Sequence, residues 1–199
     1  LSRISAPFAN PNVVAATGFI RDRNGFSFQW QACEVDAQGI DHPLDMTAET
    51  LRRGTAERAV KTQGTNCAFR RNALLEIGGF DPGYRFYLDE ADVNLRLASH
   101  AQTAIVPQAQ VHHGYEASER RAANRVPLSL YDIAASTAIF LRRHAPTSDF
   151  SAALQRRRAS QDLVQLTELG YMQLGFYQIL HLHQSSLQCT NEFAHFQRI

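Results

Sequence analysis

The sequence predicts an α/β fold, because short apolar runs that suit buried strands alternate with segments that carry helical signals. Residues 13–16 and 103–106 are the two apolar runs. Residues 71–77 and 127–143 have helix start and stop signals, and a third segment of helical periodicity lies between them. We therefore expect strands and helices to be combined in one domain.

The first sixty residues are predicted to hold two strands and a long loop. Residues 13–16 form the first strand, which Gly18 ends, and Asn24-Gly25 is the corner of a turn. Residues 26–30 alternate apolar and polar side chains, as a half-buried strand does. Trp30 suits either the core, which is the usual place for such a side chain, or a surface that stacks on a sugar ring. Residues 36–58 are polar and turn-rich, so they predict a long surface loop that covers or binds something.

The middle of the chain predicts a strand edge and two helices. Residues 65–69 suit a strand edge, and residues 71–77 suit a short helix that Gly78-Gly79 stops. Asp89 is the expected N-cap of the next helix. The apolar face of that helix is expected to consist of Leu88, Ala91, Leu95 and Ala98.

The C-terminal part of the chain favours helix. Pro127 opens a helix that runs to about Arg143, and Pro146 follows as its stop. The character of the sequence then changes, and residues 150–183 favour helix again. We therefore expect a domain over residues 1–146 and a helical tail over residues 147–199.

Composition places this chain among soluble globular proteins. Its 199 residues are 44% hydrophobic and 20% charged, which is enough for one sizeable core. The net charge of +1 argues against a broad nucleic-acid-binding surface, so no nucleic acid is expected as a partner. Cys33, Cys67 and Cys189 show neither metal-ligand nor redox spacing, which favours reduced thiols in the cytoplasm. No apolar run approaches the ~18 residues that a membrane-spanning helix needs.

Three carboxylates crowd the start of the helix that follows residue 88. Asp89, Glu90 and Asp92 repel one another unless a cation, a proton or a function keeps them together. One interpretation is structural, because acids in a first turn complement the helix dipole and Asp92 can pair with Arg96. The other is catalytic: the aromatic approach through residues 84–87 can wall a pocket, and a desolvated carboxylate becomes a usable general base.

Two further groups of polar residues are candidates for binding. His112-His113 follows the apolar run at 103–106, where loops usually carry function, and a neutral imidazole is a common metal ligand. Gly64, Thr65 and Asn66 combine a permissive glycine with two hydrogen-bonding side chains, which suits sugar hydroxyls and ordinary turns equally.

Taken in order, these motifs resemble the second half of a family 2 glycosyltransferase. The resemblance covers residues 1 to about 145 and rests on residues 64–71, residues 77–81, the acidic cluster with Arg96, and a histidine after a strand. It implies a partial GT-A fold, in which a mixed α/β sheet is flanked by helices, with a C-terminal helical segment behind it. It also implies that the chain transfers a sugar, with inversion, from a nucleotide-sugar donor to a glycan or lipid-linked acceptor with Mg²⁺ or Mn²⁺.

The resemblance assigns roles to individual residues. Relatives write Glu-Asp where this chain has Asp89-Glu90, and aligning on Asp92 and Arg96 puts Glu90 at the position of the catalytic base, with Asp89 as the rival. The metal-diphosphate histidine corresponds to His112, with His113 as the second choice. The loop that faces the donor sugar corresponds to Gly64, Thr65 and Asn66, and Asp92 and Arg96 complete the substrate-binding set.

One part of the family pattern is not found in this sequence. The nucleotide-binding half, with its metal-binding Asp-x-Asp, should precede Leu1, and the aspartates of residues 1–60 do not replace it. The sequence therefore predicts a piece of a longer enzyme, inactive by itself.

Two other functions fit the same residues. Asp89, Glu90, Asp92 and His112 can be the ligands of a metal-dependent hydrolase, provided that they converge on one metal. Alternatively, the chain is a non-catalytic interaction module whose tail, through Arg156-Arg157-Arg158, contacts an acidic partner or the inner face of a membrane, although a solvated helix face is the usual role of such a run.

Overall fold

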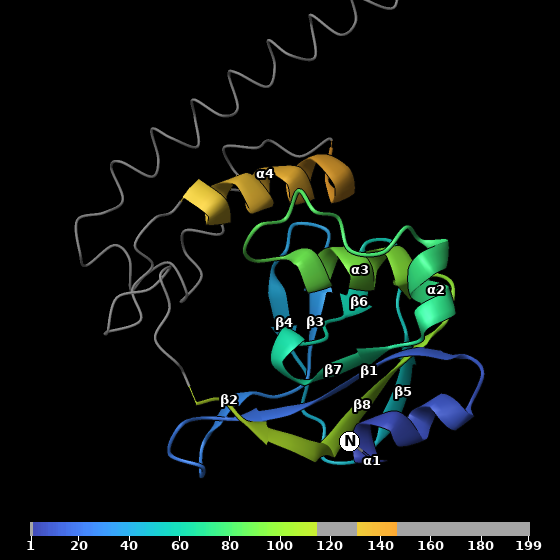
Figure 1. Cartoon of the computed structure of the whole chain (residues 1–199), viewed down its shortest axis with the longest axis vertical. Coiled ribbons are helices and arrows are strands. Elements are labelled where there is room, and N and C mark those ends of the chain that lie inside the picture. Colours follow the sequence, from blue (N-terminus) through green and yellow to red (C-terminus); the bar gives the residue numbers. More distant parts are fainter. Residues whose placement is uncertain (1, 115–130, 147–199) are drawn as a thin grey trace, which may run out of the picture.

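The structure, a computed structural model, describes residues 2–114 and 131–146, and these residues form two sheets with helices packed against them (Figure 1). The larger sheet consists of β1 (Val13–Arg21), β2 (Phe28–Trp30), β5 (Thr50–Arg53), β7 (Cys67–Phe69) and β8 (Gln102–His112). The helices are α1 (Ser2–Ser5), α2 (Arg71–Glu76), α3 (Asp89–Ala98) and α4 (Tyr131–His144), and two 3₁₀ turns are η1 (Ala6–Ala9) and η2 (Gly64–Asn66). The smaller sheet consists of β3 (Cys33–Asp36), β4 (Asp41–Pro43) and β6 (Arg58–Val60).

The larger sheet is mixed, and its centre is the pair β1 and β8. These two strands run parallel, whereas β2 and β7 pair with β1 and β5 pairs with β8 in the antiparallel sense. Nearly every residue of β1 is buried, as expected for a strand that is covered on both faces. The α/β class predicted from the sequence is therefore confirmed.

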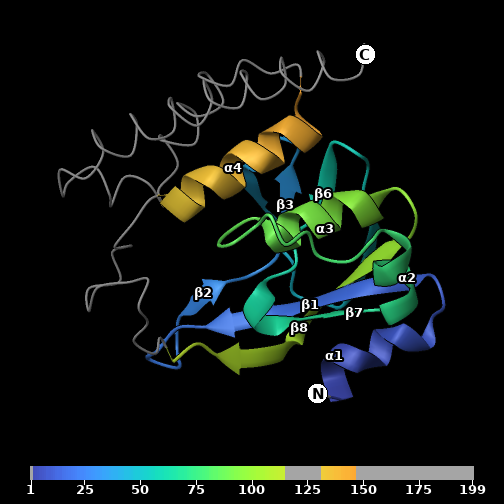
Figure 2. The same cartoon turned by 45° about the horizontal axis from the view of Figure 1, so that its top comes forward.

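Helix α3 lies on one side of this sheet and α1 on the other, which the views in Figure 1 and Figure 2 both show. The predicted apolar face of α3 is confirmed, because Leu88, Ala91, Leu95 and Ala98 pack with Val35 and Ala59 of the smaller sheet and Phe140 of α4. A second row on α3 packs on the larger sheet, through Val93 and Leu97 against Val14. Helix α3 therefore packs against both sheets, and this packing fixes the position of its N-terminal turn.

Several boundaries differ from those expected. The expected loop at 36–58 instead contains β4, β5 and the first residue of β6, because these short polar strands pair with partners that their local sequence does not reveal. The first strand does not end at Gly18 but runs on to Arg21. Gly18 is needed there because a side chain at this position would collide with the Ala109 carbonyl and the Asn66 amide.

Other predictions fare as follows. Strand β8 continues through Pro107 to His112, past an irregularity in its register with β1. The helix at 71–77 and its glycine stop are confirmed, with Gly78 and Gly79 at φ values of 82° and 75°. The helix before Pro146 ends at His144, whereas its expected start at Pro127 lies outside the described residues. The tail at 147–199, with Cys189 and the arginine run at 156–158, also lies outside them.

Candidate active site at the start of α3

The chain enters α3 through two residues in an uncommon backbone conformation. Tyr87 and Leu88 have φ values of 86° and 70°, in the left-handed region that side chains other than glycine rarely adopt. Leu88 is the N-cap and uses no side-chain hydrogen bond, so the expectation that Asp89 is the N-cap was wrong. Its buried side chain fixes the turn instead, and this leaves Asp89 and Glu90 as the first residues of the helix.

The carboxylate of Glu90 lies directly against the backbone of Gly64. A methyl group built on Gly64 would overlap Oε1 of Glu90 and come within 3.0 Å of its Cδ. The glycine of η2 and the acid of α3, which the sequence placed in separate motifs, therefore meet in space. Gly64 and Thr65 are exposed beside Glu90, so this contact lies at the surface rather than in the core.

The surroundings of Glu90 disfavour its charge. Burial, and then the neighbouring Asp89 carboxylate, which accepts a hydrogen bond from the protonated form, raise the pKa of Glu90 to about 7. The charge of Lys61 acts weakly in the opposite direction. Cys67 is another neighbour, and burial followed by the charge of Glu90 raises the pKa of its thiol to about 11. Glu90 is thus a carboxyl group that exchanges its proton near neutral pH.

Lys61 provides a fixed positive charge on this side of the molecule. Its side chain is only 11% exposed, and its Nζ lies 2.8 and 2.7 Å from the two carboxylate oxygens of Asp41. The ring of Tyr87 lies 6.0 Å from the same nitrogen. Neither Lys61 nor Asp41 stood out in the sequence, because a lysine in a polar segment carries no signal until the smaller sheet brings it beside α3.

Asn66 points into the sheet rather than toward Glu90. Its amide nitrogen donates to the carbonyl oxygens of Phe19 and Ala109, at 3.0 and 2.8 Å, and its side chain is buried. The amide therefore bridges β1 and β8 where their register slips. Of the predicted donor-facing loop, Gly64 and Thr65 are placed beside the acidic cluster, whereas the amide of Asn66 binds the strands.

Asp92 and Arg96 form the ion pair that the sequence spacing predicts, and the pair belongs to a larger cluster. Arg96 donates to Oδ2 of Asp92 at 2.9 and 2.6 Å, and it also donates to the carbonyl oxygens of Ile77 and Gly79. Oδ1 of Asp92 accepts from Arg143 at 2.9 Å and lies 2.8 Å from Nε2 of His144. Through these contacts, Asp92 and Arg96 connect α3 to α4 and to the turn that contains Gly79.

The pKa of Asp92 reflects this cluster. Burial alone would raise it, but the hydrogen bonds from His144, Arg96 and Arg143 outweigh the burial and hold it well below the usual range for an aspartate. Arg143 also pairs with Asp81 at 2.6 Å. The sequence did not predict the ion pair between Asp81 and Arg143, because the two residues lie far apart along the chain.

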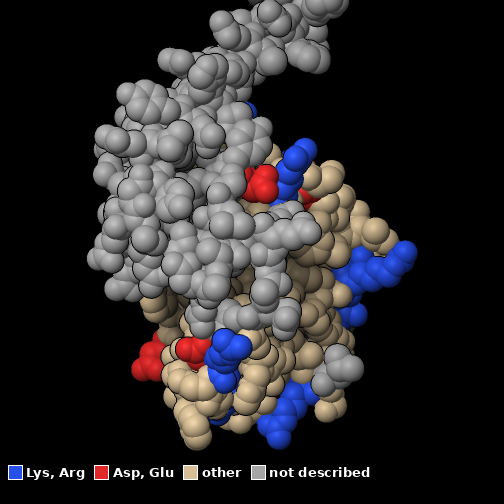
Figure 3. Space-filling view, turned by 60° about the vertical axis from the view of Figure 1, so that its left-hand side comes forward, with Lys and Arg blue, Asp and Glu red and all other residues tan. Residues whose placement is uncertain are grey.

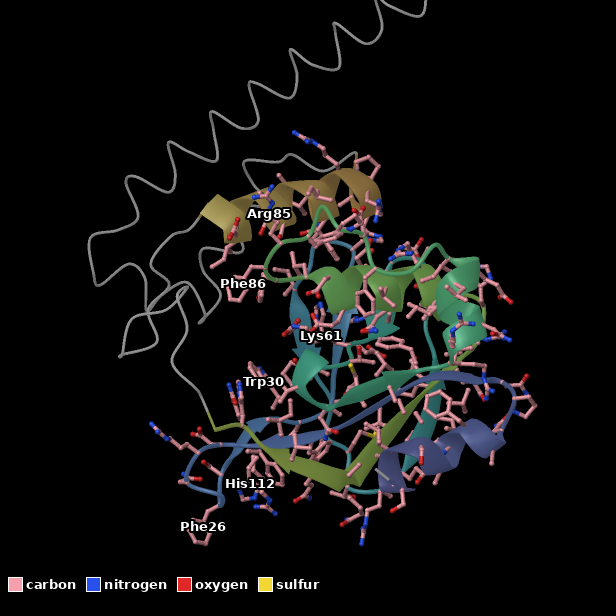
Figure 4. The ribbon with its side chains drawn as sticks, in the orientation of Figure 1. Phe26, Trp30, Lys61, Arg85, Phe86 and His112 are labelled. Carbon is pink, nitrogen blue, oxygen red and sulfur yellow. The ribbon has the colours of Figure 1, made fainter. Side chains whose placement is uncertain are left out.

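His112 lies away from the acidic cluster. It is exposed at the end of β8, and a side chain on Gly25 would come within 3.1 Å of its ring. Figure 4 shows His112 and Phe26 on one side of β1 and β2, and Lys61, Phe86 and Trp30 on the other. His113 is the histidine that packs on Trp30, with ring centroids 6.0 Å apart. The structure therefore does not bring His112 together with Glu90.

Trp30 is not a core residue, which corrects the more usual of the two interpretations of its sequence position. Its side chain is 37% exposed, as is that of Phe28, and Phe26 is 87% exposed. These rings lie in or beside β2, which forms an edge of the larger sheet, so no further strand covers them among the described residues. Of the aromatic approach to α3, Tyr84 is buried in the core with Phe140 rather than lining a surface.

Within residues 2–114 and 131–146, no three His, Cys, Asp or Glu side chains are grouped so that they can hold a metal ion. The same residues contain no helix long and apolar enough to cross a membrane. Cys33 and Cys67 are free thiols. On the face shown in Figure 3, basic side chains are scattered and several have acidic neighbours.

Comparisons of this chain with models of known families, with curated proteins and with solved structures found no match. What the fold and the site define is an α/β protein with a mixed sheet, in which a carboxyl group of raised pKa lies at the start of a buried helix, beside a glycine loop.

Proposed function

We propose that this chain carries the acceptor side of an inverting glycosyltransferase site, with Glu90 as the general base. The contact between Glu90 and Gly64 is the observation that supports this proposal most, because it joins two motifs that the resemblance to family 2 glycosyltransferases puts in one site. A base works best when its pKa is close to the operating pH, and the pKa of Glu90 is raised to about 7. The surface position of Gly64 and Thr65 gives an acceptor access to the carboxylate.

The chemistry assigned to Glu90 is a proton transfer coupled to displacement. The ionised carboxylate takes the proton of an acceptor hydroxyl, and the hydroxyl oxygen uses its electron pair to bond to the anomeric carbon of the donor sugar. The bond from that carbon to the diphosphate oxygen breaks on the opposite side, and the nucleoside diphosphate leaves with the electron pair. Attack opposite the leaving group inverts the anomeric centre, and Glu90 then returns its proton to water.

Each neighbour of Glu90 has a distinct part in this proposal. Asp89 keeps the pKa of Glu90 high, and the absence of a side chain at Gly64 leaves room for the carboxylate. Asp92 and Arg96, which the resemblance puts in the substrate-binding set, contact α4 and the glycine turn, and in this proposal they position the start of α3. The base assigned here is Glu90 rather than Asp89, because the carboxylate packed against the loop is that of Glu90.

By the resemblance, the Asp-x-Asp that holds the Mg²⁺ or Mn²⁺ belongs to the expected donor-binding half, so within this chain His112 is the residue that would contact the ion. The oxygens of Asp92 are already bound by arginine and histidine, and His112 lies elsewhere. The same geometry fails to support the alternative metal-dependent hydrolase, which needs Asp89, Glu90, Asp92 and His112 around one ion. The interaction-module alternative depends on the tail, which lies outside the described residues.

Glu90→Gln tests the proposal. The variant is made in a protein that joins this chain to its expected donor-binding half, and sugar transfer to glycan acceptors is followed with labelled nucleotide-sugars. We expect transfer to fall by roughly 10²–10⁴-fold, since general-base catalysis contributes about that much, while nucleotide-sugar binding is retained. Asp89→Asn is the matched control and should keep most of the activity. Full turnover in Glu90→Gln would rule out this role for Glu90.

A further inference from the structure

We propose that Trp30, with His113 packed on it and Gln29 orienting that histidine, is a platform for a sugar ring of the acceptor glycan. This proposal rests on the proposed function, and it places a second binding position on the same side of the molecule as Glu90. Trp30 is 37% exposed, so part of its ring face is open to a ligand.

The platform is built and held by specific contacts. The rings of Trp30 and His113 lie 6.0 Å apart at an angle of 33°. Oε1 of Gln29 lies 2.8 Å from Nδ1 of His113, and the backbone nitrogen of His113 donates to the carbonyl of Arg21. An indole face beside polar side chains of fixed orientation suits a sugar, whose C–H groups pack on the ring face while its hydroxyls exchange hydrogen bonds at the rim.

The location of Trp30 suits a glycan that reaches Glu90. Trp30 is three residues from Cys33, whose carbonyl accepts a hydrogen bond from the backbone of Lys61 at 3.0 Å. Lys61 is in turn three residues from Gly64, so the chain path limits the separation of Trp30 and Gly64 to roughly 25 Å. Trp30, Lys61 and Phe86 lie on one side of β1 and β2 in Figure 4.

The pairing of β2 argues against a membrane-inserting surface. Ile20 pairs with Trp30 but Arg21 pairs with Phe28, so the register shifts by one residue and the two aromatic side chains lie on opposite faces of the sheet. Phe28 is covered by Phe19 and by the guanidinium of Arg21, at 5.5 and 4.7 Å. The exposed rings therefore do not combine into one apolar wedge, whereas a membrane contact needs them on one face.

A charged nucleotide fits this platform less well than a neutral sugar. Lys61, the lysine on this side, is held by both oxygens of Asp41. Arg21, which pairs with Phe28, lies on the opposite face. In the part of the chain that the structure describes, the platform is therefore built from a ring face, an imidazole and an amide, which suit hydroxyl groups better than a phosphate.

The sequence provides a direct reporter, because Trp30 is the only tryptophan of the chain. Intrinsic fluorescence of the 199-residue protein is measured during titration with cellotetraose and chitotetraose, with UDP, and with phosphatidylcholine vesicles that contain phosphatidylglycerol. A saturable change with a tetrasaccharide supports the proposal. A response to UDP alone or to vesicles alone would overturn it in favour of base stacking or membrane contact, and no response to any tetrasaccharide would overturn it outright.

Calorimetry with variants then tests the residue itself. Trp30→Ala should weaken tetrasaccharide binding roughly three- to tenfold, as expected for the loss of a stacked aromatic ring, and Trp30→Phe should retain part of it. Phe26→Ala is the matched control, because it removes a more exposed ring on the other side of the sheet. Equal binding by Trp30→Ala and wild type would contradict the platform, and Trp30→Phe decides the matter if the alanine variant does not fold.

Glu90→Gln separates this inference from the proposed function. Its tetrasaccharide affinity should equal that of the wild type, since the platform needs no catalysis. Binding retained in a protein whose Glu90→Gln variant still transfers sugar would refute the assigned base and leave the platform standing. If Trp30→Ala loses tetrasaccharide binding while neither the wild type nor any variant of the joined protein transfers sugar, the platform stands and the proposed transferase function is refuted.

Discussion

Gly64 and Glu90 are in direct contact, and the carboxylate of Glu90 occupies the space that a side chain at position 64 would fill. The contact joins the η2 turn to the first turn of α3 at the protein surface. It makes the position of the carboxylate depend on a residue that contributes no functional group of its own.

Gly64→Ala should therefore impair the site without unfolding the protein. The added methyl group must displace the end of a flexible side chain, which costs little stability, but it moves the base. A displacement of about 1 Å can lower a rate by about 10²-fold, so we expect a large loss of transfer with a thermal unfolding temperature close to that of the wild type. Gly114→Ala, where an added methyl group meets no atom within 4 Å, is the matched control. A variant with normal transfer would show that Glu90 has another position during the reaction.

The raised pKa of Glu90 predicts a pH dependence of activity. Because the base must be ionised, transfer should rise with pH through a midpoint of about 7. Asp89→Asn removes the second-largest cause of the shift, so its midpoint should move to lower pH. Rate profiles of both proteins provide the measurement. An unchanged midpoint in Asp89→Asn would show that another group controls the profile.

The same shift predicts the sign of a stability effect. A carboxyl whose pKa is raised on folding contributes stability that is complete below its unfolded pKa and is lost as pH rises toward about 7. Glu90→Gln imitates the protonated form, so its stability relative to the wild type should increase between about pH 5 and about pH 8. Chemical denaturation at both pH values measures the difference. A constant difference would mean that Glu90 is not buried enough to be shifted.

Asp92 should be important for stability. Asp92→Asn leaves Arg96, Arg143 and His144 without their shared anion, and breaking a buried ion pair in this way costs about 3–5 kcal/mol. Since the pKa of Asp92 is lowered on folding, its contribution is present above its ordinary value and lost as pH falls. Asp81→Asn, which removes a more exposed partner of Arg143, should cost at most about 1 kcal/mol. Similar losses in the two variants would contradict this account.

Asn66 should contribute to the stability of the larger sheet. Asn66→Asp replaces an amide that donates to two carbonyl oxygens with an acceptor that can only repel them, so we expect a loss of at least about 1–3 kcal/mol in the free energy of unfolding. Urea denaturation provides the value. Unchanged stability would mean that the bridge between β1 and β8 contributes little.

Local patterns predicted much of the fold. The helices α2 and α3, the glycine stop of α2 and the apolar face of α3 follow from spacing alone, because each depends on neighbours within a few residues. The pair Asp92 and Arg96 was predictable for the same reason. The smaller sheet was missed because Asp41–Pro43 and Arg58–Val60 are short and polar, and only pairing with Cys33–Asp36 makes them strands.

The sequence by itself determined the α/β class, the acidic start of α3 and the ordered motifs that suggest sugar transfer, since these depend on local periodicity and on residue type. Only the tertiary structure decided which acid meets Gly64, that Asp92 is bound by α4, and that Trp30 is exposed. Such contacts join residues far apart in the chain, and their geometry depends on packing and on register shifts that a linear pattern does not encode.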